Sequence, residues 1–309
     1  MKVLVVGATG FAGFPAARAL ARAGHLVYGL VRSAEKGKKL AAEEIIPIVG
    51  DALDPTPWLP IVAELDTVID AVGGAVDLKA IGSSLLSAVA EAAQKYRPHD
   101  APKLNYIYTS GTWVHGENRS NVVTDTTPLT SPTPLVAWRP AHERAVINNP
   151  ILNGIVIRPA LIYGRSASIL ATLFKNAYNG KVSWYGTPGG RYALIHVDDL
   201  AELYVLTAER ATIAAGKIFD AANDFTESAD DLLNKLVLIS GAKGPYEYVE
   251  PSNLFESAIT TTTLIRPYLA RSVLGWQPRK AGLVDFLEVY YNAWKANEGL
   301  LTFTLTLVP

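Results

Sequence analysis

Cysteine is absent from the 309 residues of this chain. Its absence excludes disulfides, thiolate metal sites and cysteine nucleophiles. Long apolar runs are missing too: 49% of the residues are hydrophobic, but no run approaches the ~20 residues that cross a bilayer. The apolar N-terminus fits a first strand and lacks the two-part pattern of a cleavable signal. We therefore expect a soluble, cytoplasmic protein with no membrane partner and no bound metal.

An excess of charge of either sign is also missing. Lys and Arg number 28 against 29 Asp and Glu, which gives a net charge of −1. Nucleic acids and anionic membrane surfaces attract strongly basic proteins, so this balance argues against both as partners. We expect a neutral, partly apolar small molecule as the substrate, and a protein that is a monomer or a homodimer. The chain is long enough for one large α/β domain with a smaller appendage, or for two domains.

The most informative feature that is present is a glycine-rich turn directly after an apolar stretch, residues 2–6. In a Rossmann domain the first glycine of such a turn allows a tight bend, the second lets the backbone approach a pyrophosphate, and the third lets the helix pack on the strand. Amide N–H groups at the helix start then face the anion. The predicted phosphate-binding residues are Gly7, Thr9, Gly10, Phe11, Ala12 and Gly13.

Apolar strand patterns and helix patterns alternate through the first half of the chain, which predicts a Rossmann doubly wound parallel sheet of the α/β class. The expected strands are residues 2–6, 25–31, 44–49, 67–71, 104–108 and 154–157, and the expected helices are residues 11–23, 34–42, 78–95 and 140–148. Residues 117–140, rich in Pro, Thr and Ser, are expected to form a long loop beside the substrate cleft.

Beyond Gly164 the alternation breaks down, which predicts a small, discontinuous C-terminal substrate lobe. We assign residues 1–165 to the nucleotide-binding domain, with 191–225 returning to it, and residues 166–190 and 226–309 to the lobe. His196 is expected to anchor the helix that follows it. The other expected elements are a helix within 166–190, an extended segment at 192–197, helices at 228–240, 262–272 and 283–297, and a strand at 246–249.

The end of the second predicted strand indicates which dinucleotide is bound. NAD-binding Rossmann domains place an acidic residue there to bond the ribose 2′-hydroxyl, whereas this chain has Arg32-Ser33 and no acidic residue from 14 to 34. A guanidinium pairs with a 2′-phosphate, so NADP(H) is expected in preference to NAD(H). Asp51 and Ala52 are placed to hold the adenine. Ala71, Val72 and Gly73 close the fourth strand beside the cofactor.

These motifs together resemble the extended and atypical short-chain dehydrogenase/reductases, specifically the NAD(P)-dependent epimerase/dehydratase-like group. The resemblance spans most of the chain and includes the segments 108–111, 158–164, 196–201 and 274–278 besides the glycine turn. It implies that Pro159 and Ile162 lie near the nicotinamide, and Thr109 is also expected among the cofactor-binding residues. It also implies that the lobe after Gly164 encloses the substrate.

The chain departs from that family at the place where redox members carry a Tyr-x-x-x-Lys pair. The matching segment has Trp138 and His142, and the family's Ser/Thr position falls on Gly111. Tryptophan supplies no acidic proton, whereas His142 can bond the nicotinamide ribose and titrate near neutrality. The candidates for the proton-transferring residue are Ser110, Thr112, His142 and Tyr163, with His115 as a further histidine that can equally be a buried, bonded side chain.

The leading hypothesis is an NADPH-dependent oxidoreductase that reduces a carbonyl or related group of a small organic molecule. Two alternatives remain open: a non-catalytic NADP(H)-binding sensor or scaffold, and an epimerase, isomerase or lyase with its own proton-transfer residues. Several aromatic residues suit an apolar substrate if they line the cleft. They are Trp113, Trp138, Trp184, Tyr185 and Tyr192.

Overall fold

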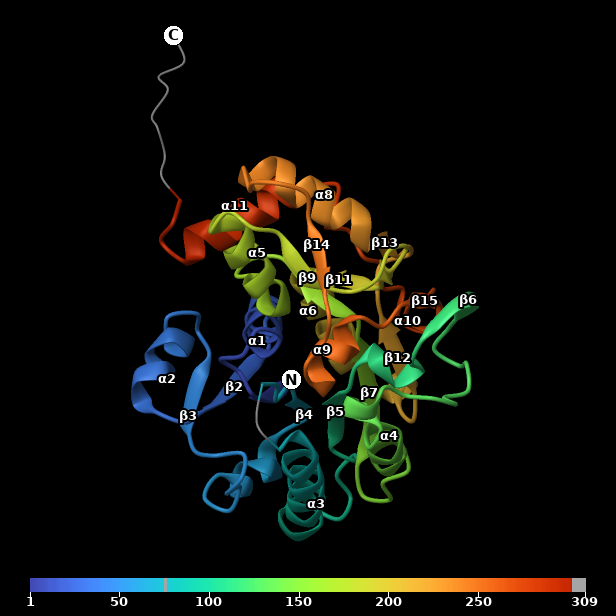
Figure 1. Cartoon of the computed structure of the whole chain (residues 1–309). Helices are drawn as coiled ribbons and strands as arrows, with labels where there is room; N and C mark the ends of the chain where they lie inside the picture. Colours follow the sequence, from blue (N-terminus) through green and yellow to red (C-terminus); the bar gives the residue numbers. More distant parts are fainter. Residues whose placement is uncertain (75–76, 302–309) are drawn as a thin grey trace.

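A seven-stranded parallel sheet forms the centre of the molecule (Figure 1), in a computed structural model that describes residues 1–74 and 77–301. Its strand order is β12-β7-β5-β4-β1-β2-β3. The order reverses between β1 and β4, and in open α/β sheets ligands bind at the carboxyl ends of the strands beside such a reversal. The strands are β1 (Lys2–Val6), β2 (Leu26–Val31), β3 (Ile46–Val49), β4 (Thr67–Asp70), β5 (Asn105–Thr109), β7 (Asn153–Pro159) and β12 (Ile218–Ala221).

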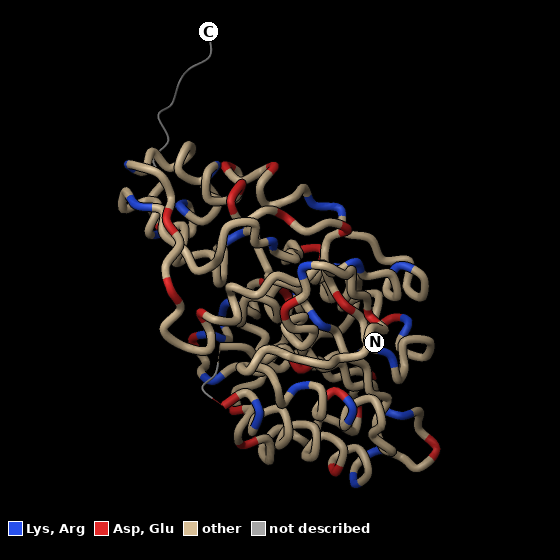
Figure 2. Tube along the Cα trace, turned by 45° about the vertical axis from the view of Figure 1, so that its right-hand side comes forward, with Lys and Arg blue, Asp and Glu red and all other residues tan. Residues whose placement is uncertain are grey.

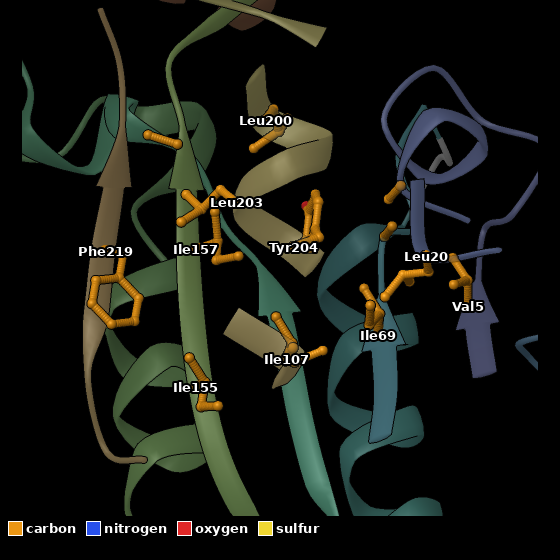
Figure 3. Close-up of a cluster of buried hydrophobic side chains, with 14 of the residues drawn as sticks. Val5, Leu20, Ile69, Ile107, Ile155, Ile157, Leu200, Leu203, Tyr204 and Phe219 are labelled. Atoms are coloured by element: carbon orange, nitrogen blue, oxygen red, sulfur yellow. The ribbon is translucent and has the colours of Figure 1, made fainter. Parts of the chain in front are cut away.

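Helices cover both faces of this sheet, which explains why its strands are continuously apolar. On one face lie α1 (Gly13–Arg22), α2 (Ala34–Ala41) and α6 (Val197–Glu209), whose Leu20, Leu203 and Tyr204 pack on Val5 and Ile107 (Figure 3). The other face carries η1 (Leu59–Glu64), α3 (Leu78–Tyr96) and α4 (Arg139–Ile147), with a separate apolar cluster. The predicted doubly wound Rossmann sheet is confirmed.

A further apolar cluster lies outside the sheet and is built from segments after residue 160. Phe174, Trp184, Leu233 and Trp294 are buried in it. Figure 1 shows these segments together above the carboxyl ends of the central strands. They are α5 (Ala171–Tyr178), α8 (Ala229–Ser240), α9 (Leu254–Ile259), α11 (Leu287–Asn297), and the paired strands β9 (Ser183–Tyr185) and β14 (Glu247–Val249).

Two sequence-based expectations in this region are wrong. The predicted helix at 262–272 is instead β15 (Thr263–Ile265), followed by α10 (Leu269–Leu274). β-branched residues favour an extended chain there, and Pro267 interrupts any helix. The expected loop at 117–140 contains β6 (Asn118–Val123), which pairs with β15, and the short η3 (Pro134–Val136).

The expected extended segment at 192–197 is divided between two small sheets. β10 (Arg191–Tyr192) pairs with β13 (Glu227–Ser228), and β11 (Leu194–His196) pairs with β8 (Leu161–Tyr163). Helix α6 then begins, and His196 Nδ1 accepts a hydrogen bond of 3.1 Å from the backbone N–H of Asp198. The predicted anchoring role of His196 is therefore confirmed. The remaining short elements are η2 (Thr112–His115), η4 (Ser168–Leu170) and α7 (Ala211–Ala214).

Basic and acidic residues are interspersed along the whole trace (Figure 2). Within residues 1–74 and 77–301, none of the helices has both the length and the apolar character that a membrane crossing requires.

Candidate active site

The glycine turn after β1 is closed so tightly that two of its glycines have no room for a side chain. Gly7 has φ +84°, and a Cβ on it would lie 2.6 Å from the carbonyl oxygen of Ala71. A Cβ on Gly13 would lie 2.2 Å from the Gly7 carbonyl oxygen. Because Gly10 also donates its N–H to that oxygen, at 2.9 Å, the turn brings the N-terminus of α1 directly against the ends of β1 and β4.

A cavity of about 680 Å³ opens above this turn, at the carboxyl ends of β4, β5 and β7. Its walls come from the glycine turn, from the segments that follow these strands, and from α9 beyond the sheet. The lining residues are Gly10, Phe11, Ala12, Ala71, Val72, Gly73, Gly74, Asp77, Leu78, Lys79, Thr109, Ser110, Gly111, Thr112, Trp113, Leu135, Val136, Trp138, Arg139, Pro159, Ala160, Leu161, Ile162, Ser168, Ile169 and Phe255.

The predicted cofactor residues fall into two groups by position. Gly10, Phe11, Ala12, Ala71, Val72, Gly73, Thr109, Pro159 and Ile162 line the cavity. Gly7, Thr9, Gly13, Arg32, Ser33, Asp51, Ala52 and His142 are not among its lining residues. The cavity thus joins the pyrophosphate and nicotinamide residues of the sequence prediction, whereas the adenine-side residues lie beyond it, at the ends of β2 and β3.

At the end of β2, Arg32 is exposed and Ser33 caps helix α2 by accepting from the N–H of Lys36. The nearest acidic residue along the chain, Glu35, pairs with Lys38 at 2.8 Å. Asp51 at the end of β3 accepts a hydrogen bond from the N–H of Leu53, as a turn residue does. Arg32 is therefore exposed to solvent at the carboxyl end of β2.

Of the four predicted proton-transfer candidates, Ser110 and Thr112 line the cavity. Tyr163 is fully buried in the apolar cluster outside the sheet, and its hydroxyl donates to the carbonyl oxygen of Ala281 at 2.8 Å. Burial raises the pKa of the Tyr163 phenol well above its ordinary value. His115, the further histidine, bonds through Nε2 to Asp220 at 2.8 Å.

His142 faces helix α3 instead of the cavity. Its ring packs edge-on against Tyr108, with ring centroids 4.6 Å apart. Its Nε2 lies close to Gly82 of α3: a Cβ added to that glycine would be only 3.2 Å from it. Burial lowers the pKa of the imidazole, with a further contribution from Arg139, which favours its neutral form. This placement does not support the expectation that His142 meets the nicotinamide ribose, because the ring packs between Tyr108 and α3 and does not line the cavity.

In the segment that leads into α4, Leu135 and Arg139 line the cavity four residues apart, and Trp138 lines it as well. Arg139 begins α4, and its Nη1 donates to the carbonyl oxygen of Thr109 at 3.1 Å. Its guanidinium also lies over the ring of Trp138, 5.1 Å from the centroid. The sequence analysis missed Arg139 because it matched the family's Tyr-x-x-x-Lys pair to Trp138 and His142.

Ser110 is also bonded to a buried network of ion pairs, which the sequence analysis did not predict. The Ser110 hydroxyl donates to Glu143 Oε1 at 2.5 Å, and Arg158 donates to both carboxylate oxygens of Glu143 at 2.9 and 2.6 Å. Arg158 Nη1 lies 3.5 Å from Asp220, which also holds His115. The one sequence signal was Arg158, a charged residue inside the largely apolar strand β7; Glu143 lies among other polar residues of α4.

Apolar and aromatic side chains line the end of the cavity that faces the C-terminal segments. Trp113 and Phe255 meet edge-on with ring centroids 6.2 Å apart, and Leu135 and Ile169 line the same cavity. The other predicted cleft aromatics lie elsewhere: Trp184 is buried in the apolar cluster outside the sheet, the hydroxyl of Tyr185 donates to Glu256, and that of Tyr192 donates to the carbonyl oxygen of Tyr185. Of the five predicted aromatics, Trp113 and Trp138 line the cavity.

Asp70 ends β4 next to the cavity and is 3% exposed. It accepts hydrogen bonds of 3.2 Å from the hydroxyl of Tyr106 and from the N–H of Val72. Burial outweighs these bonds and raises the pKa of the carboxyl from 3.8 to about 6. At neutral pH the folded protein therefore holds a buried carboxylate at a cost in stability.

We expect Asp70→Asn to raise the free energy of unfolding at pH 8, by about 3 kcal/mol at most, since each unit of pKa difference corresponds to about 1.4 kcal/mol. The raised folded-state pKa gives a contribution that is fully present below pH 3.8 and is lost as the pH rises through about 6. The gain of the variant should therefore shrink between pH 8 and pH 5. Urea unfolding at both values measures it, with exposed Asp54→Asn as control; a gain that grows toward pH 5 would contradict the assignment.

Comparison with known proteins agrees with this geometry. The model of the NAD dependent epimerase/dehydratase family matches residues 3–222. The chain belongs to this family. An uncharacterized protein of Schizosaccharomyces pombe is 27% identical over 295 residues, covering 93% of this chain and 98% of the yeast protein.

Among solved structures, dTDP-glucose 4,6-dehydratase from Bacillus anthracis in complex with NAD is similar at a TM-score of 0.81 and 16% identity, covering 97% of this chain and 98% of that one. UDP-glucuronic acid 4-epimerase from Bacillus cereus in complex with UDP-glucuronic acid and NAD has a TM-score of 0.75 and 19% identity, covering 96% and 100%. At these identities the likeness shows the epimerase/dehydratase fold.

The site residues of this family member fit a dinucleotide. Gly10 lines the cavity at the N-terminus of α1, where the first backbone N–H groups precede the intrahelical ladder and suit a phosphate. A Cβ on Gly73 would meet nothing within 4 Å, so the backbone after β4 leaves open space. Family and fold together indicate an oxidoreductase of the NAD-dependent epimerase/dehydratase type.

Proposed function

We propose that the protein is an NADP(H)-dependent oxidoreductase that reduces a carbonyl of a small, partly apolar molecule. The observation that carries this proposal is one continuous cavity lined by the glycine turn at Gly10, by the hydroxyl-bearing Ser110 and Thr112, and by the aromatic pair Trp113 and Phe255. Such a cavity offers a cofactor site, a proton-transfer group and an apolar substrate site in contact with one another.

The chain's own residues then divide the remaining work. A bound dinucleotide supplies the hydride chemistry. Ser110 exchanges a proton with the substrate oxygen, and Arg139, beside Thr109 at the same strand end, stabilises negative charge that develops there. Trp113 and Phe255 exclude water from the substrate. Before α4 and at its start, Leu135 and Arg139 line the cavity four residues apart, and neither is a tyrosine or a lysine. We therefore propose that the site works without the Tyr-x-x-x-Lys pair.

The substrate is proposed to lie between the sheet and the C-terminal lobe, residues 166–190 and 226–309. Ile169 on η4 and Phe255 on α9 both come from this lobe and line the cavity. An apolar wall favours a substrate without the charged diphosphate of a sugar nucleotide. A panel of aromatic and aliphatic aldehydes and ketones, followed by nicotinamide absorbance, tests the proposal; wild-type protein that binds the cofactor but consumes none with any of them contradicts it.

A preference for NADP(H) over NAD(H) is proposed from Arg32. The exposed guanidinium after β2 suits the 2′-phosphate, and no acidic side chain stands between residues 14 and 34 to repel it. We expect Arg32→Ala to weaken NADPH binding by about 10- to 100-fold, the value of one or two charge-assisted hydrogen bonds, and to leave NADH binding unchanged. Calorimetric titration measures both constants.

Arg22→Ala is the matched control, because Arg22 is also exposed but lies at the far end of α1. It should change neither dissociation constant. If Arg32→Ala weakened the affinity for NADPH and for NADH equally, Arg32 would not be the residue that binds the 2′-phosphate.

An epimerase, isomerase or lyase is the second candidate, and it is favoured by the family model that matches residues 3–222. In that case the cofactor is reduced and reoxidised within one turnover, so substrate changes with no net consumption of NADPH. Product analysis by mass spectrometry beside the absorbance assay separates the two candidates.

A further inference from the structure

Ser110 belongs to the cavity wall, and its hydroxyl is bonded to a buried carboxylate. Ser110 lines the cavity, and its Oγ donates its proton to Glu143 Oε1 at 2.5 Å. A serine hydroxyl has one proton and two lone pairs. With that proton directed at Glu143, the oxygen offers lone pairs to the cavity, so Ser110 is arranged to accept a proton from the cavity as it passes its own proton inward.

We propose that Glu143 is the proton acceptor behind Ser110, and that the two side chains form a relay between the substrate oxygen and the protein interior. The inference rests on the proposed oxidoreductase function, and it adds a residue that acts through Ser110 without touching the substrate. Glu143 is therefore a positioning and proton-holding residue.

During oxidation of an alcohol, the relay carries a proton from the substrate to Glu143. The substrate O–H proton passes to Ser110 Oγ while the Ser110 proton passes to Glu143 Oε1. The substrate carbon gives up its hydrogen with two electrons to the oxidised cofactor, and the oxygen's electron pair forms the C=O bond. In carbonyl reduction each transfer runs backwards: the carbon gains hydride, and the proton moves from Glu143 through Ser110 to the oxygen. Glu143 exchanges its proton with water through Ser110 when the cavity is free of substrate.

The surroundings of Glu143 hold its carboxylate in one orientation. Its side chain is 1% exposed, and Arg158 donates Nε to Oε1 and Nη2 to Oε2. Arg158 is itself buried, and the Asp220 carboxylate on β12 lies 3.5 Å from its Nη1. Because both ends of the carboxylate are fixed, Oε1 stays directed at Ser110 with no need for water.

Helix α4 explains how these groups meet at one place. Arg139 and Glu143 are four residues apart and therefore lie on the same side of the helix, which packs on β7. Arg139 donates to the carbonyl oxygen of Thr109, and Glu143 accepts from the hydroxyl of Ser110. Two neighbouring residues at the end of β5 are therefore bonded by two residues one turn apart on α4. One helix thus positions a cation beside the cavity and a proton acceptor behind it.

The test is Glu143→Gln, which keeps the size of the side chain and an acceptor oxygen but removes its capacity to hold a transferred proton. We expect kcat to fall at least 100-fold, within the range of about 10²- to 10⁴-fold for proton transfer by a positioned side chain. KM and NADPH affinity should stay within about twofold, because Glu143 does not line the cavity. Exposed Glu91→Gln on α3 is the matched control and should behave as wild type.

A proton inventory gives a readout that a purely structural role would not move. In mixtures of H₂O and D₂O, wild-type kcat should depend on the deuterium fraction with the curvature of two protons in flight. Glu143→Asp keeps a carboxylate at a greater distance from Ser110, so it should retain that curvature at a reduced kcat. If Glu143→Gln fails to fold, shown by its melting curve, a Glu143→Asp variant with wild-type kcat overturns the relay.

The outcomes separate the relay from the function on which it rests. Wild-type turnover that Glu143→Gln matches, with a linear inventory in both, overturns the relay and leaves the oxidoreductase proposal intact. Wild-type protein that binds NADPH but turns over no carbonyl substrate overturns the proposed function, and the relay with it.

Discussion

Replacing Ser110 with alanine is expected to lower kcat by about 100- to 10,000-fold, the range for loss of a positioned proton-transfer group. Among the described residues that line the cavity, the hydroxyl groups belong to Thr109, Ser110, Thr112 and Ser168. Thr109 is already bonded to the hydroxyl of Tyr204 at 2.6 Å, whereas Ser110 is the one bonded to a buried carboxylate. Removing it disconnects the cavity from Glu143.

The effect should be confined to turnover. NADPH affinity, measured by calorimetry, should stay within about twofold of wild type, since one hydroxyl adds little to the binding of a dinucleotide. Ser168→Ala removes a hydroxyl from η4 at the other side of the cavity and serves as the matched control, with kcat near wild type. A Ser110→Ala variant as active as Ser168→Ala would remove Ser110 from the mechanism.

Replacing Gly10 with valine is expected to weaken the binding of NADP(H) by at least about 100-fold. A Cβ at Gly10 would lie 3.1 Å from the Gly7 carbonyl oxygen, which is close but not prohibitive, so the fold should persist. The two further methyl groups of valine would occupy the space above the turn, where a pyrophosphate approaches the helix N-terminus. Calorimetric titration with NADP⁺ measures the loss.

Gly24→Ala is the comparison, because Gly24 ends the same helix and a Cβ there would meet nothing within 4 Å. Its φ of +84° predicts a loss of about 1 kcal/mol in stability with no loss in cofactor affinity. A Gly10→Val protein that melts near wild type and binds NADP⁺ as tightly would show that the turn is not the phosphate site.

Most of the sheet was predictable because its signal is local. Each central strand is an apolar run that needs two covered faces, and residues 2–6 with the glycine turn define the first strand and helix without any partner. The errors came where local pattern and tertiary pairing disagree. Residues 262–272 have apolar spacing that fits a helix, yet Thr263 pairs with Asn118 across the molecule.

That Gly10, Ala71 and Pro159 line one cavity was predictable for the same reason, since each follows a recognisable predicted strand; that they bind a cofactor stays a prediction. The residues of α4 that line the cavity were harder to predict, because successive helical side chains point about 100° apart and tertiary packing decides which of them meet the cavity. His142 therefore turned to α3, while Arg139 reached the cavity. The partners of Glu143 lie on other elements, so the pattern of α4 alone could not show which residues it pairs with.

The central claim is that the cavity beside Gly10 binds a nicotinamide dinucleotide with its 2′-phosphate at Arg32. Isothermal titration of the purified chain with NADP⁺ and NADPH, and then with NAD⁺ and NADH, tests it most directly. We expect saturable binding at one site, tighter for NADP⁺ and NADPH than for NAD⁺ and NADH. Absence of heat and of any thermal stabilisation with all four compounds would contradict it.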